Sequence, residues 1–213
     1  MASNIELRTY VYLDSLQLQM ASYLATVSKG YLPVADQACA IVEISPGMEI
    51  NRLTDVALKA TNVQPGIQIV ERLFGLLEVH SSDQADARQA GQAILDSIGL
   101  TEKDRIKPKI TTSQLIKNIT DYHSQLINKM RYGNMVLRGD TLYIMEVQPA
   151  GYAYFAANEA EKASRINIIN VTGFGSFGRV YIAGDEAEVL VSKSIVEEKL
   201  AGLDGRDTSG GRE

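Results

Sequence analysis

The sequence predicts an α+β fold in which two copies of one small domain follow each other along the chain. The 213-residue chain aligns with itself at a constant offset of 103 residues, so that Gly30 corresponds to Gly133 and Pro46 to Pro149. Such a repeat fixes the architecture before any single residue is interpreted. Each copy also mixes the apolar periodicities of strands and of helices. The apolar fraction of 45% is ordinary for a globular protein, so each half can bury its own core.

The two copies correspond without a gap over most of their length. Further matching positions are Leu13 and Leu16 with Ile116 and Ile119, Glu43 with Glu146, Ala57, Lys59 and Ala60 with Ala160, Lys162 and Ala163, and Phe74-Gly75 with Phe177-Gly178.

The first copy begins with a strand, Ile5–Leu13, that is rich in Tyr, Val and Leu. A helix follows, with apolar residues at helical spacing up to Gly30: Leu13, Leu16, Met20, Tyr23, Leu24 and Val27. Ala38–Ile44 is an apolar strand that ends at the turn Pro46-Gly47. A second helix presents one apolar face, formed by Ile50, Leu53, Ala57 and Leu58.

The segment Ile67–Leu77 is strand-like, continues to His80 and is interrupted by one charged pair. Ser82-Asp83 can cap the third helix of the first copy. The inner face of that helix is formed by Ala87, Ala90, Gly91, Ile94, Leu95 and Ile98.

The second copy repeats this order. Its elements are the strand Ile110–Ile116, a helix lined by Ile116, Ile119, Leu126, Ile127 and Met130, the strand Leu142–Val147, the small-residue helix Ala153–Ala163, a pair of strands within Arg165–Gly184, and the helix Glu188–Leu200. Each copy therefore reads strand, helix, strand, helix, strand, strand, helix. This order predicts a mainly antiparallel sheet with helices on one face.

The repeat also sets the expected domain boundaries. We expect the first domain at residues 5–100 and the second at residues 110–203. Residues 101–109 are charged and contain a proline, which is typical of a linker. Residues 204–213 are polar and glycine-rich, so we expect a flexible tail.

Charge and composition exclude several classes of function. The net charge of −5 and the pI near 5.2 argue against binding to nucleic acid or to an anionic membrane surface, since both require a basic footprint. The first residues do not form a signal-peptide pattern, and no apolar stretch is long enough to span a bilayer. Cys39 is the single cysteine, which excludes a disulfide framework and fits a reducing cytoplasm.

The segment Gly173-Phe174-Gly175-Ser176-Phe177-Gly178 satisfies the GxGxxG pattern of dinucleotide sites. In such a site the glycines must leave a strand and open a helix whose N-terminus faces the pyrophosphate. Here the strand-like sequence Arg179–Ile182 follows instead, so the pattern is interpreted as a tight turn between strands. The turn corresponds to Glu71-Arg72 in the first copy.

Glu71-Arg72 interrupts an otherwise apolar strand. Neighbouring strand residues point to opposite faces, and burying unpaired charges is costly. We therefore expect the pair at a bulge or a loop, where it is either an ordinary surface ion pair or part of a charged cluster at an oligomer axis.

Lys59 and Lys162 occupy the same place in both copies, at the end of the small-residue helix. They either complement the helix dipole or lie at a subunit edge. His123 lies on the apolar face of its helix, and His80 has no cysteine or histidine partner at metal-ligand spacing. We find no catalytic centre, no metal site and no cofactor site in the sequence.

Several segments together resemble the bacterial microcompartment (BMC) shell domain. They are Ile5–Arg8, Glu43–Gly47, Val70–Leu76, Ala157–Ala163, Arg165–Ile168 and Val180–Asp185. The family carries a helix that ends in Lys-Ala, then a strand, a glycine-serine turn and a strand that ends in Gly-Asp. The order of elements is similar to the circularly permuted form, and two permuted copies resemble the tandem-domain shell proteins of carboxysomes.

This resemblance implies a structural, non-enzymatic protein. It implies a homotrimer that forms a pseudohexagonal tile with a central pore, and members of the group can stack two trimers face to face. Glu71 and Arg72 would form the pore gate, and Gly173, Phe174, Gly175, Ser176 and Phe177 would line the pore. Phe174 and Phe177 depart from the usual small-residue pore loop of the family. Lys59 and Lys162 would be the tile-edge lysines.

The implied location is the carboxysome shell in the cytoplasm. The implied partners are other copies of the chain, other shell proteins and phosphorylated metabolites in transit, such as sugar phosphates. An open ring lined by arginines would suit anions.

Three alternatives remain open at this point. The tile could belong to a catabolic microcompartment. The chain could be a trimeric α+β metabolite-sensing module with ligand pockets between subunits. It could also be a nucleotide-dependent enzyme that uses the Gly173–Gly178 turn.

Overall fold

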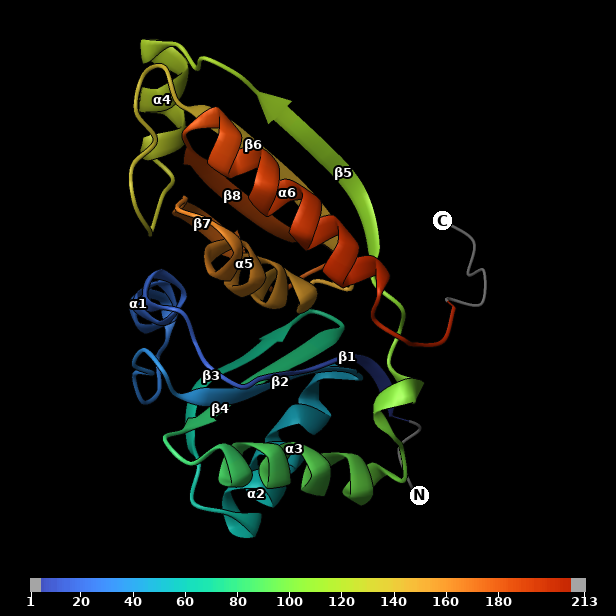
Figure 1. The fold of residues 1–213 in the computed structure, drawn as a ribbon. Coiled ribbons are helices and arrows are strands. Elements are labelled where there is room, and N and C mark those ends of the chain that lie inside the picture. Colours follow the sequence, from blue (N-terminus) through green and yellow to red (C-terminus); the bar gives the residue numbers. More distant parts are fainter. Residues whose placement is uncertain (1–4, 208–213) are drawn as a thin grey trace.

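The computed structural model of the chain describes residues 5–207. It contains two four-stranded antiparallel sheets, one in each half of the sequence. Figure 1 shows the two halves one above the other, with a helix of the second half between the two sheets.

The first half contains β1 (Glu6–Leu13), α1 (Leu18–Val27), β2 (Ala38–Ser45), a 3₁₀ turn (Gly47–Glu49), α2 (Ile50–Ala60), β3 (Gln64–Glu71), β4 (Phe74–Ser81) and α3 (Gln84–Ile98). The second half contains β5 (Lys109–Ile116), α4 (Asp121–Asn128), β6 (Thr141–Gln148), α5 (Tyr152–Ala163), β7 (Asn167–Thr172), β8 (Gly178–Gly184) and α6 (Glu186–Ala201). A second 3₁₀ turn, Glu102–Asp104, joins the halves. The predicted α+β class and the predicted order of elements are confirmed.

The internal repeat is visible in the details of both sheets. The strand orders are β1-β2-β4-β3 and β5-β6-β8-β7. Each sheet has two bulges, between Leu7 and Thr9 and between Pro65 and Ile67 in the first sheet. The second sheet has them at the positions 103 residues later, Ile110/Thr112 and Ile168/Asn170.

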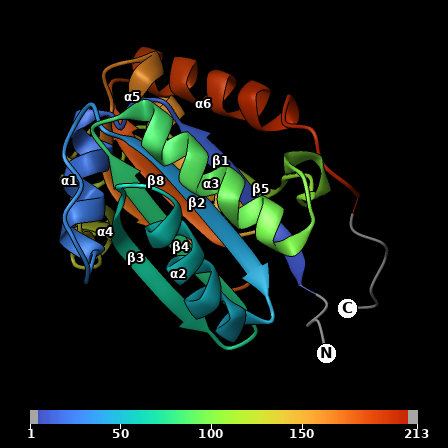
Figure 2. The same ribbon diagram turned by 90° about the horizontal axis from the view of Figure 1, so that it is seen from below.

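Helices α2, α3, α5 and α6 cover the faces of the two sheets. Helices α2 and α3 lie along one face of the first sheet, as Figure 2 shows, and α5 and α6 pack together on the second. The opposite face of the first sheet packs against α5, so one continuous apolar core contains residues from both halves, among them Ile41, Leu76, Tyr154 and Ala157. Within residues 5–207, no helix covers the corresponding face of the second sheet in the way that α5 covers the first.

Side chains of α5 fix α1 at the junction of the two halves. Glu161 accepts hydrogen bonds from the backbone N–H groups of Gln19 and Met20 at 2.8 and 2.9 Å. Asn158 accepts one from the N–H of Gln17 at 2.9 Å. These contacts satisfy N–H groups that the first turn of a helix leaves free, and they place a negative charge at the positive end of α1.

The first helix of each half is shorter than the apolar spacing predicted. Leu13 belongs to β1, and Leu16 lies before the start of α1. In the second half Ile116 and Ile119 lie outside α4, and Met130 beyond its end is 63% exposed. The apolar spacing continues across the preceding loop because Leu16 and Ile119 are buried by tertiary contacts, which periodicity cannot distinguish from a helix face.

The start of the expected flexible tail makes defined contacts. The backbone N–H of Arg206 donates to the carbonyl of Arg105 at 2.8 Å, and its guanidinium pairs with Glu6 at 2.6 Å. The described part of the tail, residues 204–207, therefore lies along the linker, while residues 208–213 fall outside the described residues. No described helix is long and apolar enough to cross a membrane.

Candidate pore-lining loops

Glu71 and Arg72 lie at the tip of the β3–β4 hairpin. Glu71 is the last residue of β3 and pairs with Phe74, so Arg72 and Leu73 form the turn. The Arg72 side chain is 91% exposed, and its Nε lies 3.8 Å from Oε1 of Glu71. The expectation that this pair occupies a loop agrees with the hairpin tip.

The second predicted segment, Gly173–Phe177, is the loop between β7 and β8. A Cβ at Gly173 would lie 2.1 Å from the ring of Tyr154, so only glycine allows the loop to pass over this buried ring. Gly178 opens β8, a strand and not a helix. The GxGxxG pattern therefore lacks the helix N-terminus that binds a pyrophosphate, as the sequence indicated.

Arg72 and Gly175 occupy corresponding positions in the two copies, and both have left-handed backbones. The φ angle is 50° at Arg72 and 93° at Gly175. Glycine adopts this region freely, whereas for other residues this backbone conformation costs about 1–2 kcal/mol. The position therefore favours glycine, and arginine is retained in the first copy at a conformational cost. Such strain commonly marks a functional residue.

The two loops lie side by side in one chain. A Cβ at Gly175 would be 3.9 Å from Cγ of Glu71. Together the loops border a hollow of about 500 Å³, lined by Glu71, Arg72, Leu73, Phe74, Thr172, Phe174, Gly175, Ser176, Phe177 and Arg179. The structure thus brings together six of the seven residues predicted for the gate and the pore lining, while Gly173 lies against the Tyr154 ring in the same loop. Arg179 is an additional cation that the sequence reasoning did not select.

A buried ion pair supports the hairpin from behind. Arg8 Nε donates to Glu43 at 3.1 Å, and the Arg8 guanidinium stacks on the Phe74 ring, with Cζ 3.5 Å from its centroid. Glu43 also accepts from Thr9 at 2.9 Å and from the backbone N–H of Gly151 at 3.0 Å. Burial raises the pKa of Glu43, and Arg8 opposes that shift. This network ties the β3–β4 hairpin to the second half.

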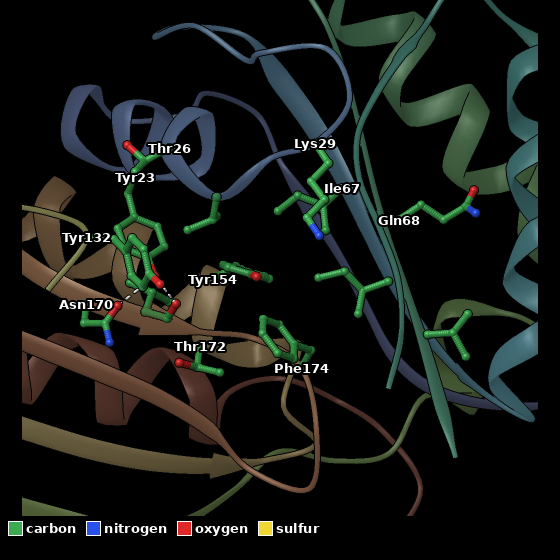
Figure 3. Close-up of a pocket in the computed structure, with 14 residues that line it drawn as sticks. Tyr23, Thr26, Lys29, Ile67, Gln68, Tyr132, Tyr154, Asn170, Thr172 and Phe174 are labelled. Atoms are coloured by element: carbon green, nitrogen blue, oxygen red, sulfur yellow. Dashed lines mark hydrogen bonds between the residues drawn. The ribbon is translucent and has the colours of Figure 1, made fainter. Parts of the chain in front are cut away.

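A cavity of about 620 Å³ lies behind the loops, between β3 and β7. Figure 3 shows Tyr23, Tyr132 and Asn170 on one side and Lys29, Ile67 and Gln68 on the other, with Tyr154 and Phe174 at its floor. The Tyr23 hydroxyl donates to Asn170 Oδ1 at 2.8 Å and contacts the carbonyl of Val171. Burial raises the pKa of Tyr23 to about 12, so its hydroxyl stays protonated at neutral pH. Phe174 therefore belongs to both hollows.

The two predicted tile-edge lysines differ in their contacts. Lys59 ends α2, is largely exposed and pairs with Asp55 at 2.7 Å. Lys162 ends α5 and lies 3.6 Å from Asp14 of the first half. Both lie in the last turn of their helices, where a cation complements the dipole. Their role at a tile edge stays a prediction.

The described residues contain no cluster of three or more His, Cys, Asp or Glu side chains that could hold a metal ion. His123 on α4 is partly exposed. His80 is fully buried beside Glu78, with 3.0 Å between His80 Nδ1 and Glu78 Oε1. The sequence reasoning considered His80 only as a metal ligand and missed this pair.

Comparison with known proteins gives consistent matches. The family described as the CsoS1D N-terminal domain matches residues 7–104. The chain is 53% identical over 208 residues to the carboxysome shell protein CcmP of Synechococcus elongatus, covering 98% of both chains. It is 45% identical to the carboxysome shell protein CsoS1D of Hydrogenovibrio crunogenus, covering 93% of this chain and 98% of the relative.

Two solved structures share the whole fold. One is the fused permuted hexameric shell protein MSM0275 from the RMM microcompartment, with a TM-score of 0.92, 42% identity and coverage of 95% of this chain and 100% of the other. The other is the double ringed trimeric shell protein MSM0271 from the same type of microcompartment, with a TM-score of 0.92, 38% identity and coverage of 95% and 99%.

Proposed function

Because the chain belongs to the family of tandem-domain microcompartment shell proteins that includes CcmP and CsoS1D, a family of structural proteins and not of enzymes, we propose that it forms a homotrimeric tile of the carboxysome shell with a gated pore. The gate would consist of Glu71 and Arg72, and the loop Gly173–Phe177 would complete the pore lining. The observation that best supports a gate is the left-handed backbone of Arg72, at a position where the second copy has glycine.

The contact between the two halves supports the trimer. Helix α1 is covered by α5, and Tyr23 is only 3% exposed. On α4, the corresponding residue Leu126 is 59% exposed, and Tyr122 and Met130 on either side are exposed as well. The second half thus presents the face that the first half buries. A neighbouring copy that offers α2 would cover α4 as α5 covers α1, and three copies would close a ring of six domains.

Polar groups at the same two faces also correspond. Glu43 accepts the backbone N–H of Gly151 inside the chain. In the repeat, Glu146 corresponds to Glu43 and Met48 corresponds to Gly151. Glu146 Oε1 lies 2.8 Å from Arg179 Nε, and Met48 is 70% exposed. In the ring, Glu146 of one copy would accept the N–H of Met48 from its neighbour. The ion pair of Glu146 with Arg179 would then play the role that Arg8 and Glu43 play inside the chain.

The trimer would gather three copies of Glu71 and Arg72 around one axis. If Arg72 turns toward Glu71 of a neighbour, ion pairs close the opening, and if the side chains separate, the opening widens. Three arginines at the opening would favour anions, which suits phosphorylated metabolites such as sugar phosphates. Face-to-face stacking of two trimers and contact with other shell proteins complete the proposal.

The assembly is tested by native mass and by imaging. Light scattering across a concentration series should give about 70 kDa for three chains of 23.3 kDa, or about 140 kDa for a stacked pair. Electron cryomicroscopy of the same sample should place Glu71 and Arg72 at the three-fold axis. A stable monomer or dimer, or an axis that lies elsewhere, would contradict the pore.

A metabolite-sensing module is a second candidate, favoured by the cavity between β3 and β7. A sensor requires a ligand in that cavity and no lateral assembly. A tile requires edge-to-edge sheets in concentrated protein, so electron microscopy of such samples separates the two. A tile of another microcompartment is the third candidate, and co-purifying shell proteins would identify it.

A further inference from the structure

Glu78 and His80 on β4 form a hydrogen-bonded pair in the apolar core between the two halves. Both side chains are completely buried, with 3.0 Å between His80 Nδ1 and Glu78 Oε1. His80 Nε2 is buried and has no hydrogen-bond partner within residues 5–207. The second copy has Tyr181 and Ala183 at these positions, so this fold does not require the pair. An incompletely satisfied buried pair in only one copy calls for an explanation.

The Glu78 carboxylate holds the strand that carries the gate. The backbone N–H groups of Gly66 and Ile67, at the bulge of β3, lie close enough to the carboxylate to favour its charged form and to oppose the rise of its pKa that burial causes. A Cβ at Gly66 would lie 2.3 Å from Oε2 of Glu78, so the backbone passes directly over the carboxylate. From this bulge β3 leads to Glu71 and Arg72. In the second copy β7 has the same bulge between Ile168 and Asn170, but the neighbouring strand β8 has no acidic residue that could contact it.

Among the described residues, His80 is the one basic side chain placed to neutralise Glu78. Cys39 lies opposite His80 on β2, and burial followed by the Glu78 charge raises its pKa, so it remains a neutral thiol. Tyr154 approaches from α5, and burial raises its pKa as well. Within the described chain, Glu78 makes no ion pair with a lysine or an arginine. A lone carboxylate would therefore remain uncompensated here, which is expensive.

We propose that Glu78 and His80 form a proton-dependent latch that holds β3 and thereby regulates the gate. The regulatory part rests on the pore proposed above. With one proton shared between the two side chains, the pair is electrically neutral overall and Glu78 keeps its close contact with the β3 backbone. Without that proton, an unpaired carboxylate remains in the apolar core. Moving β3 would bring that carboxylate to water and would displace Arg72.

The direction of the pH effect follows from burial. Burial raises the pKa of Glu78, so the latched arrangement binds the proton more tightly than an open one. Because a proton shared by two groups titrates as a property of the pair, the relevant pKa is that of the pair. The latch is therefore firmest below the lower pKa of the open state, and it is lost as the pH rises through the higher pKa of the latched pair.

Hydrogen exchange of the trimer between pH 6 and pH 9 tests the latch, after correction for the intrinsic pH dependence of amide exchange. We expect protection of residues 64–72 to fall as the pH rises, by about tenfold for each pKa unit that separates the latched and open states. Residues 167–175 of the second copy are the matched internal control and should show no such fall. Equal behaviour of the two segments would overturn the proposal without any variant.

The substitution Glu78→Gln should remove the effect. A glutamine can accept from the β3 backbone and donate to His80 Nδ1, so it mimics the protonated pair. We expect pH-independent protection of residues 64–72 in E78Q, and wild-type behaviour in H123Q, which changes the other histidine. A pH-dependent loss that persists in E78Q would overturn the latch.

The link to the gate has its own readout. Electron cryomicroscopy at both pH values should show Arg72 displaced at the higher pH in the wild type and fixed in E78Q. If β3 loosens while Arg72 keeps its position, the regulation of the gate is overturned. Hydrogen exchange does not depend on a pore, so failure of the latch and failure of the proposed pore give different results.

Discussion

Replacing Arg72 by glycine should stabilise the protein while removing the gate. The φ angle of 50° at Arg72 lies in the left-handed region, which costs a non-glycine residue about 1–2 kcal/mol. Relief of this strain stabilises the folded state. Glycine also gives the unfolded chain more conformational freedom, which offsets about 0.5–1 kcal/mol of that stabilisation. Loss of the ion pair with Glu71 adds little, since the Arg72 side chain is 91% exposed and the two atoms are 3.8 Å apart.

The net gain is therefore about 0.5–1 kcal/mol, which for a chain of this size raises Tm by about 1–4 °C. Thermal unfolding at one fixed protein concentration measures this shift, because the Tm of an oligomer depends on concentration. Arg72→Ala is the matched control, since alanine removes the guanidinium but keeps the Cβ and the strain. Gly175→Ala, at the corresponding position with φ of 93°, makes the opposite change and should lower Tm by about 1–4 °C.

The order expected for Tm is R72G above wild type, R72A close to wild type and G175A below it. If R72G lowers Tm as G175A does, the arginine side chain stabilises the turn. The strained backbone of Arg72 would then stabilise the fold and would not be retained for function.

Three further predictions concern the loops and the lysines. Glu71→Ala should shift the gate toward the open position in cryomicroscopy maps, because the arginine loses its partner, and unchanged maps would contradict the gate. Lys59→Ala and Lys162→Ala should weaken sheet formation in electron micrographs while light scattering still reports the trimer, and loss of the trimer would assign them another role. Gly173→Ala should lower stability by about 1–3 kcal/mol in thermal unfolding, because its Cβ would overlap the Tyr154 ring; an unchanged Tm would show that the ring moves aside.

The order of the elements was predictable because each copy states it independently. A strand such as Ala38–Ser45 is apolar at every second position or more, and the same pattern returns 103 residues later. The order of elements could therefore be inferred twice, once from each copy, and an ambiguous segment in one copy could be assigned from its counterpart in the other. The exceptions are the starts of α1 and α4, where buried loop residues continue the helical spacing.

The positions of the β3–β4 and β7–β8 loops could be predicted from the sequence, but their backbone conformations could not. The alignment of Glu71-Arg72 with Phe174-Gly175 put both segments at one loop position. It could not show that Arg72 adopts the left-handed backbone that its counterpart glycine adopts, or that the two loops touch. Both facts depend on how the hairpins emerge from sheets that are packed against each other.

The burial of Glu78, His80 and Glu43 could not be inferred from the sequence. Glu78 and His80 alternate with Leu77 and Val79, and this pattern is typical of a strand with one face in water. The packing of α1 and of α5 from the second half closes that face and buries the pair. The same holds for Glu43, whose partners Arg8 and Gly151 come from another strand and from the other half.

The sequence by itself determined the duplicated α+β architecture, the loops that carry Glu71 and Arg72, and the resemblance to shell proteins. These follow from local periodicity and from a repeat, both of which are written in residue order. The tertiary structure decided which polar residues lose contact with water and which face of the second half remains open to a neighbour. Those properties depend on surfaces that meet only when distant segments pack, and one-dimensional spacing does not encode that meeting.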